Sequence, residues 1–342
     1  MLPPPRSLLA ATVTVLVLIC VASIAPGADT GGFAVGVNCA KSPTWAENCR
    51  RLGVKVGRVE WDISTSPSTM DSLMTTYASK GIKVQLLAGF YGRVPTVQEA
   101  QNLRSWALRY GPGGTFWQGR SDGYLAVTHI EFGNETSYPY QFGEGGSWWT
   151  LSSYTNRART YALRVKDAAL ALQGTGVGLL VQAEDAGSAS STWVDNMVAA
   201  VPDLGSYTAG WTIHPYGPNG SARIDRMLGY LAAKGLPTSI PVYITEWGLA
   251  TDNGRSLSNN YGYPTNMTYA DAATTLRNVF ASWRSSYGSR LAQVIVYQHA
   301  DQRAPGRTSN REHYFGLLTH TGGEKGDYTA TARRLLSDQS GP

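Results

Sequence analysis

Charged residues are scarce in this chain of 342 residues, because Lys, Arg, Asp and Glu together make up only 15% of it. An average soluble protein carries about 25%. The 29 basic and 24 acidic residues give a formal net charge of +5, and the basic ones are dispersed along the sequence. A clustered basic footprint is therefore missing, and we expect no nucleic-acid partner. The share that charged residues usually have is occupied by small, uncharged polar and aromatic residues, namely Gly, Ser, Thr, Tyr and Trp. Such a composition suits contact with neutral, hydroxylated ligands.

Several motifs that mark other chemistries are also missing. The sequence has no HExxH and no paired CxxC, and its five histidines are scattered, so we expect no metal and no cofactor. No GxSxG is present, which disfavours serine-hydrolase chemistry. Internal repeats and a linker, which a cell-surface adhesion module would carry, are missing too.

Cysteine is rare, with three residues in the chain. Cys20 lies in the N-terminal segment, whereas Cys39 and Cys49 are ten residues apart. In an exported chain such a pair predicts one disulfide, which would close a short loop between the first strand and its helix. Two buried free thiols are the alternative.

The N-terminal segment has the pattern of a secretory signal. Arg6 is the only charged residue before Asp29, and a run of apolar and small residues extends from Leu8 to Ala25. We therefore expect residues 1–28 to be a signal peptide and the protein to be secreted. Because the run approaches the roughly 20 residues of a membrane span, an uncleaved N-terminal membrane anchor is the alternative.

From Gly32 onward, short β-rich runs alternate with longer helical ones. The pattern predicts strands over Phe33–Asn38, Val56–Asp62, Lys83–Phe90, Thr128–Gly133, Val177–Ala183, Gly210–Tyr216, Val242–Trp247 and Gln293–Gln298. It predicts helices over Thr44–Leu52, Ser68–Lys80, Thr96–Tyr110, Tyr154–Leu172, Ser191–Val201, Ala222–Lys234, Tyr269–Tyr287 and Tyr328–Leu336.

Eight successive strand–helix units predict an α/β fold, a closed (β/α)8 TIM barrel, as a single domain over residues 31–340. Several strands, such as VGLLV and QVIVY, are almost wholly apolar, which indicates burial on both faces as in a parallel sheet. An open doubly wound sheet is the alternative, but neither GxGxxG nor a P-loop follows any predicted strand.

Carboxylates gather at the predicted strand ends, and in a barrel these ends meet at the C-terminal face where catalytic groups lie. The set comprises Glu60, Asp62, Glu131, Glu135, Glu184, Asp185, Glu246 and Asp301. Cleavage of a glycosidic bond requires two such groups, one to protonate the leaving oxygen and one to attack or to activate water.

Two of these carboxylates lie in motifs that resemble a known family. Residues 130–136 read IEFGNET and residues 242–248 read VYITEWG. They resemble the strand-four and strand-seven signatures of the clan A glycoside hydrolases, which are retaining β-glycosidases on a TIM barrel. The resemblance covers the whole predicted barrel and implies that Glu135 is the acid/base and Glu246 the nucleophile. For this chemistry Glu135 must be protonated while Glu246 stays ionised.

The resemblance also implies roles in substrate binding for residues around this pair. Arg58 matches the strand-two arginine that contacts the nucleophile, and Asn134 can donate its amide to a sugar hydroxyl. His214 and Tyr216, in the strand-six motif WTIHPYG, are candidates to support the nucleophile. Trp247, next to the nucleophile, is a candidate sugar-facing wall.

One segment departs from the family pattern. Many clan members carry a tryptophan at the end of strand eight as a floor for the sugar, whereas this chain reads VYQHADQ. Tyr297 or His299 would have to serve instead.

Other residues have a structural reading beside the functional one. We interpret Glu131 as a buried, paired structural group, and Trp247 can simply pack. Trp148 and Trp149 could form a sugar platform or pack their loop. Glu184 and Asp185 could line a subsite or begin a solvated loop.

The sequence thus predicts a secreted glycoside hydrolase that acts on β-linked poly- or oligosaccharides by a retaining mechanism, with no cofactor. Retention predicts that the carboxyl groups of Glu135 and Glu246 lie about 5–5.5 Å apart. Transglycosylation through the same intermediate and a non-catalytic carbohydrate-binding protein on the same barrel are the alternatives.

Overall fold

The computed structural model of the protein describes residues 32–92, 95–138, 151–183 and 192–338. The predicted signal segment, residues 1–28, lies outside this range. Within it, eight parallel strands close into a barrel in chain order, with β1 paired to β8. The strands are β1 (Ala34–Asn38), β2 (Val56–Asp62), β3 (Lys83–Gly89), β4 (His129–Phe132), β5 (Gly178–Gln182), β6 (Gly210–Ile213), β7 (Val242–Trp247) and β8 (Leu291–Val296).

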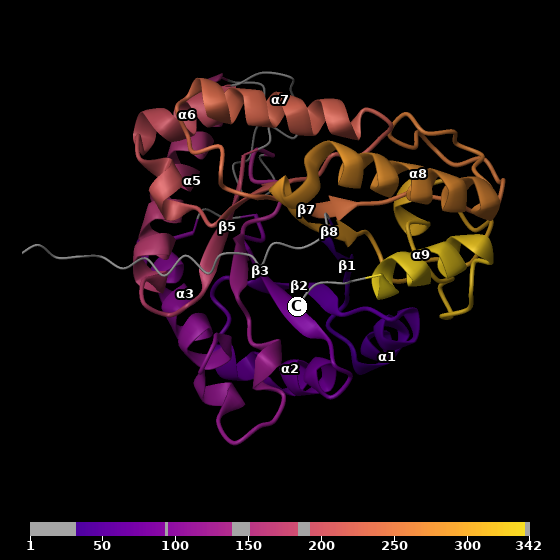
Figure 1. The fold of residues 1–342 in the computed structure, drawn as a ribbon, viewed down its shortest axis with the longest axis horizontal. Helices are drawn as coiled ribbons and strands as arrows, with labels where there is room; N and C mark the ends of the chain where they lie inside the picture. Colours follow the sequence, from indigo (N-terminus) through magenta and orange to yellow (C-terminus); the bar gives the residue numbers. More distant parts are fainter. Residues whose placement is uncertain (1–31, 93–94, 139–150, 184–191, 339–342) are drawn as a thin grey trace, which may run out of the picture. The chain divides into compact units, whose positions relative to one another are not determined.

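Helices alternate with the strands and surround the barrel (Figure 1). They are α1 (Pro43–Leu52), α2 (Asp71–Ala78), α3 (Val97–Tyr110), α5 (Leu151–Leu172), α6 (Thr192–Ala200), α7 (Gly220–Ala233), α8 (Tyr269–Tyr287) and α9 (Asp327–Ser337). The predicted (β/α)8 barrel is confirmed, and the predicted element boundaries differ from the observed ones by a few residues. Strand six, for example, ends at Ile213, so that His214 and Tyr216 begin the loop.

The strands form because their side chains are buried on both faces. In β5, Leu180 and Val181 are fully buried although they point in opposite directions, one toward the barrel interior and the other toward the helices. In β1 the chain has no room for a side chain at Gly36, where a Cβ atom would lie 2.5 Å from Cδ1 of Ile295 on β8. The apolar runs therefore place each strand between the barrel interior and the helical layer.

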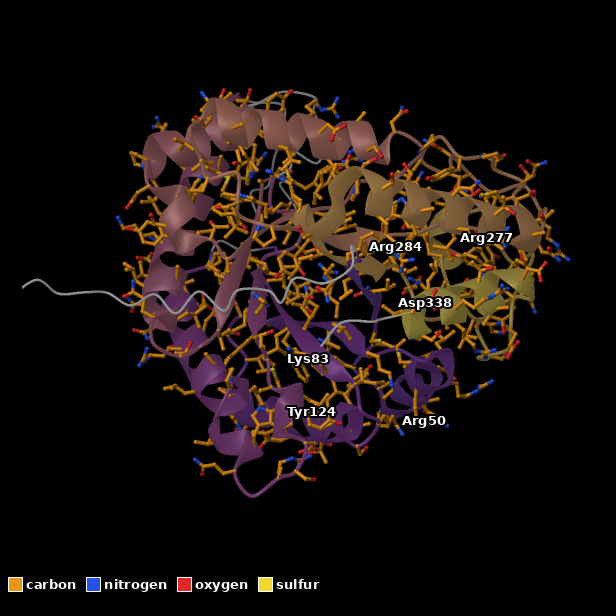
Figure 2. The ribbon with its side chains drawn as sticks, viewed as in Figure 1. Arg50, Lys83, Tyr124, Arg277, Arg284 and Asp338 are labelled. Atoms are coloured by element: carbon orange, nitrogen blue, oxygen red, sulfur yellow. The ribbon has the colours of Figure 1, made fainter. Side chains whose placement is uncertain are left out.

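The helices present polar faces outward. Arg50 on α1 and Arg277 on α8, both labelled in Figure 2, are exposed. The N-terminus of α3 is fixed by a capping box in which Thr96 and Glu99 satisfy each other's backbone N–H groups. In the part of the chain that the structure describes, no helix is both long and apolar enough to span a membrane.

All eight strands run in the same direction, so their carboxyl ends meet at one mouth of the barrel. β2, β4 and β7 each bring a glutamate to this mouth or to the layer directly below it. These are Glu60, Glu131 and Glu246.

Candidate active site

Arg58 on β2 joins the other strands that build the site. Its Nε and one terminal nitrogen donate to the two carboxylate oxygens of Glu131 on β4, over 2.6 and 3.0 Å. The other terminal nitrogen donates to Glu246 on β7 over 2.6 Å. Burial acts to lower the pKa of Arg58, but the charges of Glu131 and Glu246 outweigh it and raise the pKa. The guanidinium therefore stays charged and fixes both carboxylates.

The pairing of Glu131 agrees with its structural interpretation. Its side chain is 1% exposed and both oxygens accept from Arg58, so it stands below the cleft as the fixed counter-charge. Asn134 is held by the same arginine, because its Oδ1 accepts from Arg58 over 2.8 Å. With the oxygen occupied, the amide nitrogen of Asn134 is the group left to donate to a ligand.

Glu135 follows β4 in an unusual backbone conformation. Its φ is +43°, in the left-handed region that a residue with a side chain rarely adopts. Gly133, two residues earlier, has φ +79°, and a Cβ there would lie 2.4 Å from Cγ2 of Thr136. The N–H of Thr136 donates to Oε1 of Gln182 on β5 over 2.9 Å. This tight turn directs the Glu135 carboxyl group into the barrel mouth, a placement typical of functional sites.

Glu135 and Glu246 face each other across the mouth, with His214 beside them. One side-chain ligand atom from each of the three lies within 4.8 Å of the others. Nδ1 of His214 is 3.2 Å from Oε1 of Glu135 and 3.8 Å from Oε2 of Glu246. Both carboxylates are reachable by solvent, with 23% of the Glu135 side chain and 13% of the Glu246 side chain exposed.

His214 is oriented by a hydrogen bond of its second nitrogen, Nε2, with the hydroxyl of Thr245 over 3.0 Å. Burial acts to lower the pKa of His214, but the charge of Glu246 and the hydrogen bond with Glu135 outweigh it, so the pKa is raised. Its imidazole can therefore share a proton with the acid/base candidate.

Glu246 receives a second donor from Tyr216, whose hydroxyl donates to Oε2 over 3.1 Å. Burial and the charge of Glu246 raise the pKa of Tyr216, so the phenol stays protonated. Each oxygen of Glu246 thus accepts one hydrogen bond, and together the two donors stabilise the ionised carboxylate.

Three ligand atoms this close could also hold a metal ion, but the donor set argues against it. Arg58 already places a full positive charge 2.6 Å from Glu246. A second cation beside the guanidinium would be repelled, so we interpret the group as a proton-sharing network.

The cleft above these residues has a volume of about 610 Å³. Its floor carries Arg58, Asn134, Glu135 and Glu246, and two sets of residues form its walls. One set comes from β1 to β3 and the segments after them and contains Asn38, Lys41, Glu60 and Tyr91. The other set follows β6, β7 and β8 and contains Tyr216, Tyr261, Tyr297, Gln298, His299 and Glu312. This size is in the ordinary range for a site that binds a small molecule or part of a chain.

Tyr297 and His299 line the cleft at the end of β8, where the sequence analysis placed a substitute for a tryptophan floor. The His299 ring packs edge-on against Trp45, with centroids 4.7 Å apart. Burial lowers the pKa of His299 to about 4, so it is neutral near neutral pH. Tyr297 packs edge-on against Phe315, with centroids 5.6 Å apart.

The expectation for Trp247 as a sugar-facing wall is wrong. Trp247 is fully buried and packs against Phe280 and Trp283 of α8, with centroids 5.8 and 5.4 Å away. The cause is a β-bulge, since Ile244 pairs with Val294 but Trp247 pairs with Val296. The extra residue turns Glu246 into the mouth and Trp247 outward to the helical layer.

Cys39 and Cys49 are buried and adjacent, with their sulfur atoms 2.6 Å apart. They are free thiols in the structure, so their predicted disulfide is not formed there. Trp148, Trp149, Glu184 and Asp185 lie outside the described residues.

Four residues of the cleft have no role predicted from the sequence. Glu60 is predicted only as a strand-end carboxylate, and Lys41, Tyr91 and Tyr261 are not predicted at all. The spacing of Arg58 and Glu60 on one strand was the available signal for Glu60, because side chains two apart share a face. The other three follow strands or lie in loops, where no local pattern marks them.

Comparison with known proteins agrees on the fold. No protein-family model matches the sequence, and no curated protein matches it. One similar solved structure is that of a fungal β-1,4-galactanase, at 14% identity and a TM-score of 0.58. The match covers 88% of this chain and 99% of that one. CJP38, a β-1,3-glucanase and allergen of Cryptomeria japonica pollen, matches at 14% identity and a TM-score of 0.54, over 86% and 98% of the chains.

A GH5_18 from Bifidobacterium longum subsp. infantis matches at 13% identity and a TM-score of 0.58, over 90% of this chain and 79% of that one. At such low identity these likenesses establish the fold and leave the activity to the geometry of the site. This chain therefore has the same (β/α)8 barrel fold as these solved structures.

Proposed function

We propose that this protein is a secreted glycoside hydrolase that cleaves β-linked glycans with retention of configuration. The observation that carries the proposal is the pair Glu135 and Glu246, which have oxygens within 4.8 Å of each other across one cleft. Retaining enzymes hold their two carboxyl groups about 5–5.5 Å apart, whereas inverting enzymes need about 6.5–9.5 Å to admit a water molecule.

In the first step Glu246 attacks the anomeric carbon of the bound sugar. Arg58 and Tyr216 each donate to one of its oxygens, which orients the carboxylate toward the cleft. The bond between the anomeric carbon and the leaving oxygen breaks as Glu135 gives that oxygen its proton. The products of this step are a covalent glycosyl ester on Glu246 and the released alcohol.

In the second step Glu135, now ionised, takes a proton from water, and the water oxygen attacks the anomeric carbon. The ester bond breaks and Glu246 is restored. His214 lies 3.2 Å from Glu135, so its imidazole can stabilise the negative charge that Glu135 acquires between the steps. The amide nitrogen of Asn134 is positioned to bond a hydroxyl of the reacting sugar, a contact that strengthens as charge develops.

Secretion rests on the N-terminal segment, where residues 1–28 combine one early arginine, an apolar run and a small-residue end. A scarcity of charge and a tyrosine-rich cleft are consistent with a neutral glycan substrate.

The experiment that tests the proposal separates the roles of the two carboxylates. Glu246→Ala should lose at least about 10⁴-fold in turnover of every glycan that the parent cleaves, because no covalent route remains. Glu135→Ala should keep its first step on an aryl glycoside with a very good leaving group and accumulate the covalent intermediate, which mass spectrometry can detect. Azide should restore turnover of Glu135→Ala with retained configuration, and azide added to Glu246→Ala should give the inverted product.

Glu47→Gln is the matched control, because Glu47 is an exposed carboxylate on α1 that pairs with Arg50 and Lys80. It should retain parent activity. Near-parental turnover in both Glu135→Ala and Glu246→Ala would contradict the assignment, and binding of glycans without turnover by the parent would favour the carbohydrate-binding alternative.

A further inference from the structure

Three residues on the wall formed by β1 to β3 have no part in the two steps described above. They are Lys41, which follows β1, Glu60 on β2 and Tyr91, which follows β3, and all three line the cleft. We refer to them as the Lys41–Glu60–Tyr91 cluster.

Glu60 lies two residues beyond Arg58 on the same strand, so its side chain stands on the same face, one layer nearer the mouth. It is only partly exposed, and burial raises the pKa of Glu60 despite the nearby charges of Arg58 and Lys41. Glu246 and Glu131 are the acidic groups whose charges act on it. The cluster therefore belongs to the nucleophile side of the cleft.

Lys41 extends over this wall from an exposed position. Its Nζ lies 3.4 Å from the hydroxyl of Tyr91 and 5.1 Å from the centroid of the Trp61 ring. Among the residues that the structure describes, its ammonium forms no salt bridge, and it acts on Glu60 only through charge. A cation held over aromatic rings keeps its remaining N–H donors for a ligand.

Tyr91 is a large aromatic side chain that is 51% exposed at the edge of the cleft. Its φ of +51° lies in the left-handed region, which costs free energy for a tyrosine. The pKa of Tyr91 is raised to about 12 by burial and by the charges of Glu60 and Asp62. An exposed ring held in this way offers an apolar surface beside hydrogen-bonding groups, which is what the face of a sugar ring requires.

We propose that the Lys41–Glu60–Tyr91 cluster is a subsite for a second, uncharged sugar unit on the glycone side of the scissile bond. This inference rests on the proposed function. The sugar that Glu246 attacks stays bonded to Glu246, and the leaving group departs on the side of Glu135. Groups on the nucleophile side therefore contact the part of the glycan that is retained.

The charges of the cluster determine the class of sugar. Lys41 supplies donors and Glu60 supplies an acceptor, so neighbouring hydroxyls of one sugar can bond to both. A uronic acid would bring a second negative charge to the partly buried Glu60, and an amino sugar would bring a positive charge to Lys41. Neutral sugars meet neither repulsion, so glycans with at least two neutral units before the cleaved bond are the preferred substrates.

The test compares kcat/KM for paired 4-nitrophenyl β-glycosides, a monosaccharide and the matching disaccharide, in the gluco, galacto and manno series. The parent should prefer the disaccharide of the active series by at least about tenfold. Glu60→Gln, Lys41→Met and Tyr91→Ala should each reduce that preference several-fold and change the monosaccharide rate little. A matching β-glucuronide pair should show no disaccharide preference.

Tyr124→Ala and Lys55→Met are the matched controls. Tyr124, labelled in Figure 2, is 76% exposed and does not line the cleft, and Lys55 is exposed before β2. Both should keep the parental preference. Equal losses on monosaccharide and disaccharide in the three cluster variants, or no loss on either, would overturn the subsite while leaving hydrolysis intact.

Calorimetric titration with the neutral oligosaccharides separates this inference from the proposed function. Binding that the cluster variants weaken, in a parent that turns over no glycan, would contradict hydrolysis and support the subsite. If the parent hydrolyses glycans but Tyr91→Ala and Lys41→Met bind the oligosaccharides as tightly as the parent does, hydrolysis would be supported and the subsite contradicted.

Discussion

Arg58 is a single residue on which several functional groups depend. It is 2% exposed and bonds Glu131, Glu246 and Asn134, which come from β4, β7 and the loop after β4. A planar guanidinium can serve all three because its N–H groups point in fixed and different directions. Tyr216 and His214 add further hydrogen bonds, but Arg58 is the group that links Glu246 to the loop that carries Asn134 and Glu135.

Replacing Arg58 should therefore affect stability and activity together. Arg58→Met leaves the buried Glu131 without a partner and should reduce the free energy of unfolding by about 3–5 kcal/mol. Arg58→Lys keeps the positive charge, so it should be more stable than Arg58→Met. It lacks the planar guanidinium with its several N–H donors, so it should still lose at least about 100-fold in kcat/KM. Urea unfolding and steady-state kinetics measure both effects.

Arg50→Met is the matched control, because Arg50 is an exposed arginine that pairs with Glu47 one helical turn away. It should leave the urea midpoint of unfolding close to that of the parent, because an exposed ion pair contributes little to stability. If Arg58→Met unfolds at the same urea concentration as the parent, Arg58 does not have the part assigned to it.

At the scale of elements, the connection between β1 and α1 is the one that bears most on the cleft. Cys39 directly follows β1, Cys49 lies on α1, and their sulfur atoms are 2.6 Å apart in the protein interior. Cys39, Ala40 and Lys41 also line the cleft. A covalent link between the two sulfurs would tie this wall to the helix.

We expect Cys39 and Cys49 to be joined in secreted material. The double variant Cys39→Ala/Cys49→Ala should then unfold with about 2–3 kcal/mol less free energy than the oxidised parent, because a short closed loop is released in the unfolded chain. A reductant should lower the melting temperature of the parent and leave that of the double variant unchanged. Two free thiols in the intact mass of the secreted protein would show that the disulfide prediction is wrong.

At the scale of the whole molecule, stability should depend on pH through histidines that the fold keeps neutral. His129, at the first position of β4, has its pKa lowered to about 4 by burial and by the charge of Lys83. His299 is lowered to about 4 mainly by burial. In the unfolded chain both titrate near 6.5.

Between pH 6.5 and 4 the unfolded chain therefore binds protons that the folded protein does not. Stability should fall as the pH falls through this window, by up to about 3 kcal/mol for each of these histidines. His129→Gln should flatten the dependence of the urea midpoint on pH in this window without changing the chemistry at the mouth. His214, whose pKa is raised, acts in the opposite sense, since its contribution is present below 6.5 and is lost as the pH rises through the folded value. A slope that His129→Gln leaves unchanged would contradict the prediction.

Much of the fold follows from local patterns. Apolar runs such as residues 177–183 are buried wherever they form strands, and each is followed by a longer amphipathic segment, so the order of elements is present in the chain itself. The Asn-Glu pair after strand four and the Thr-Glu pair on strand seven are short enough to be recognised without the fold. The sequence by itself thus determined the barrel, the two candidate carboxylates and the proximity of the cysteines.

The tertiary structure decided which side chains meet. Tyr243 and Thr245 point into the barrel, as their contacts with His129 and His214 show, so simple alternation would send Trp247 inward and Glu246 outward. The bulge against β8 reverses this, and it depends on a strand about 50 residues further along the chain. Barrel closure likewise brings together the segments joined by the contacts of Arg58 and by the Lys41–Glu60–Tyr91 cluster. Strand register and bulges are set by pairing between distant strands, so they leave no mark in the local sequence.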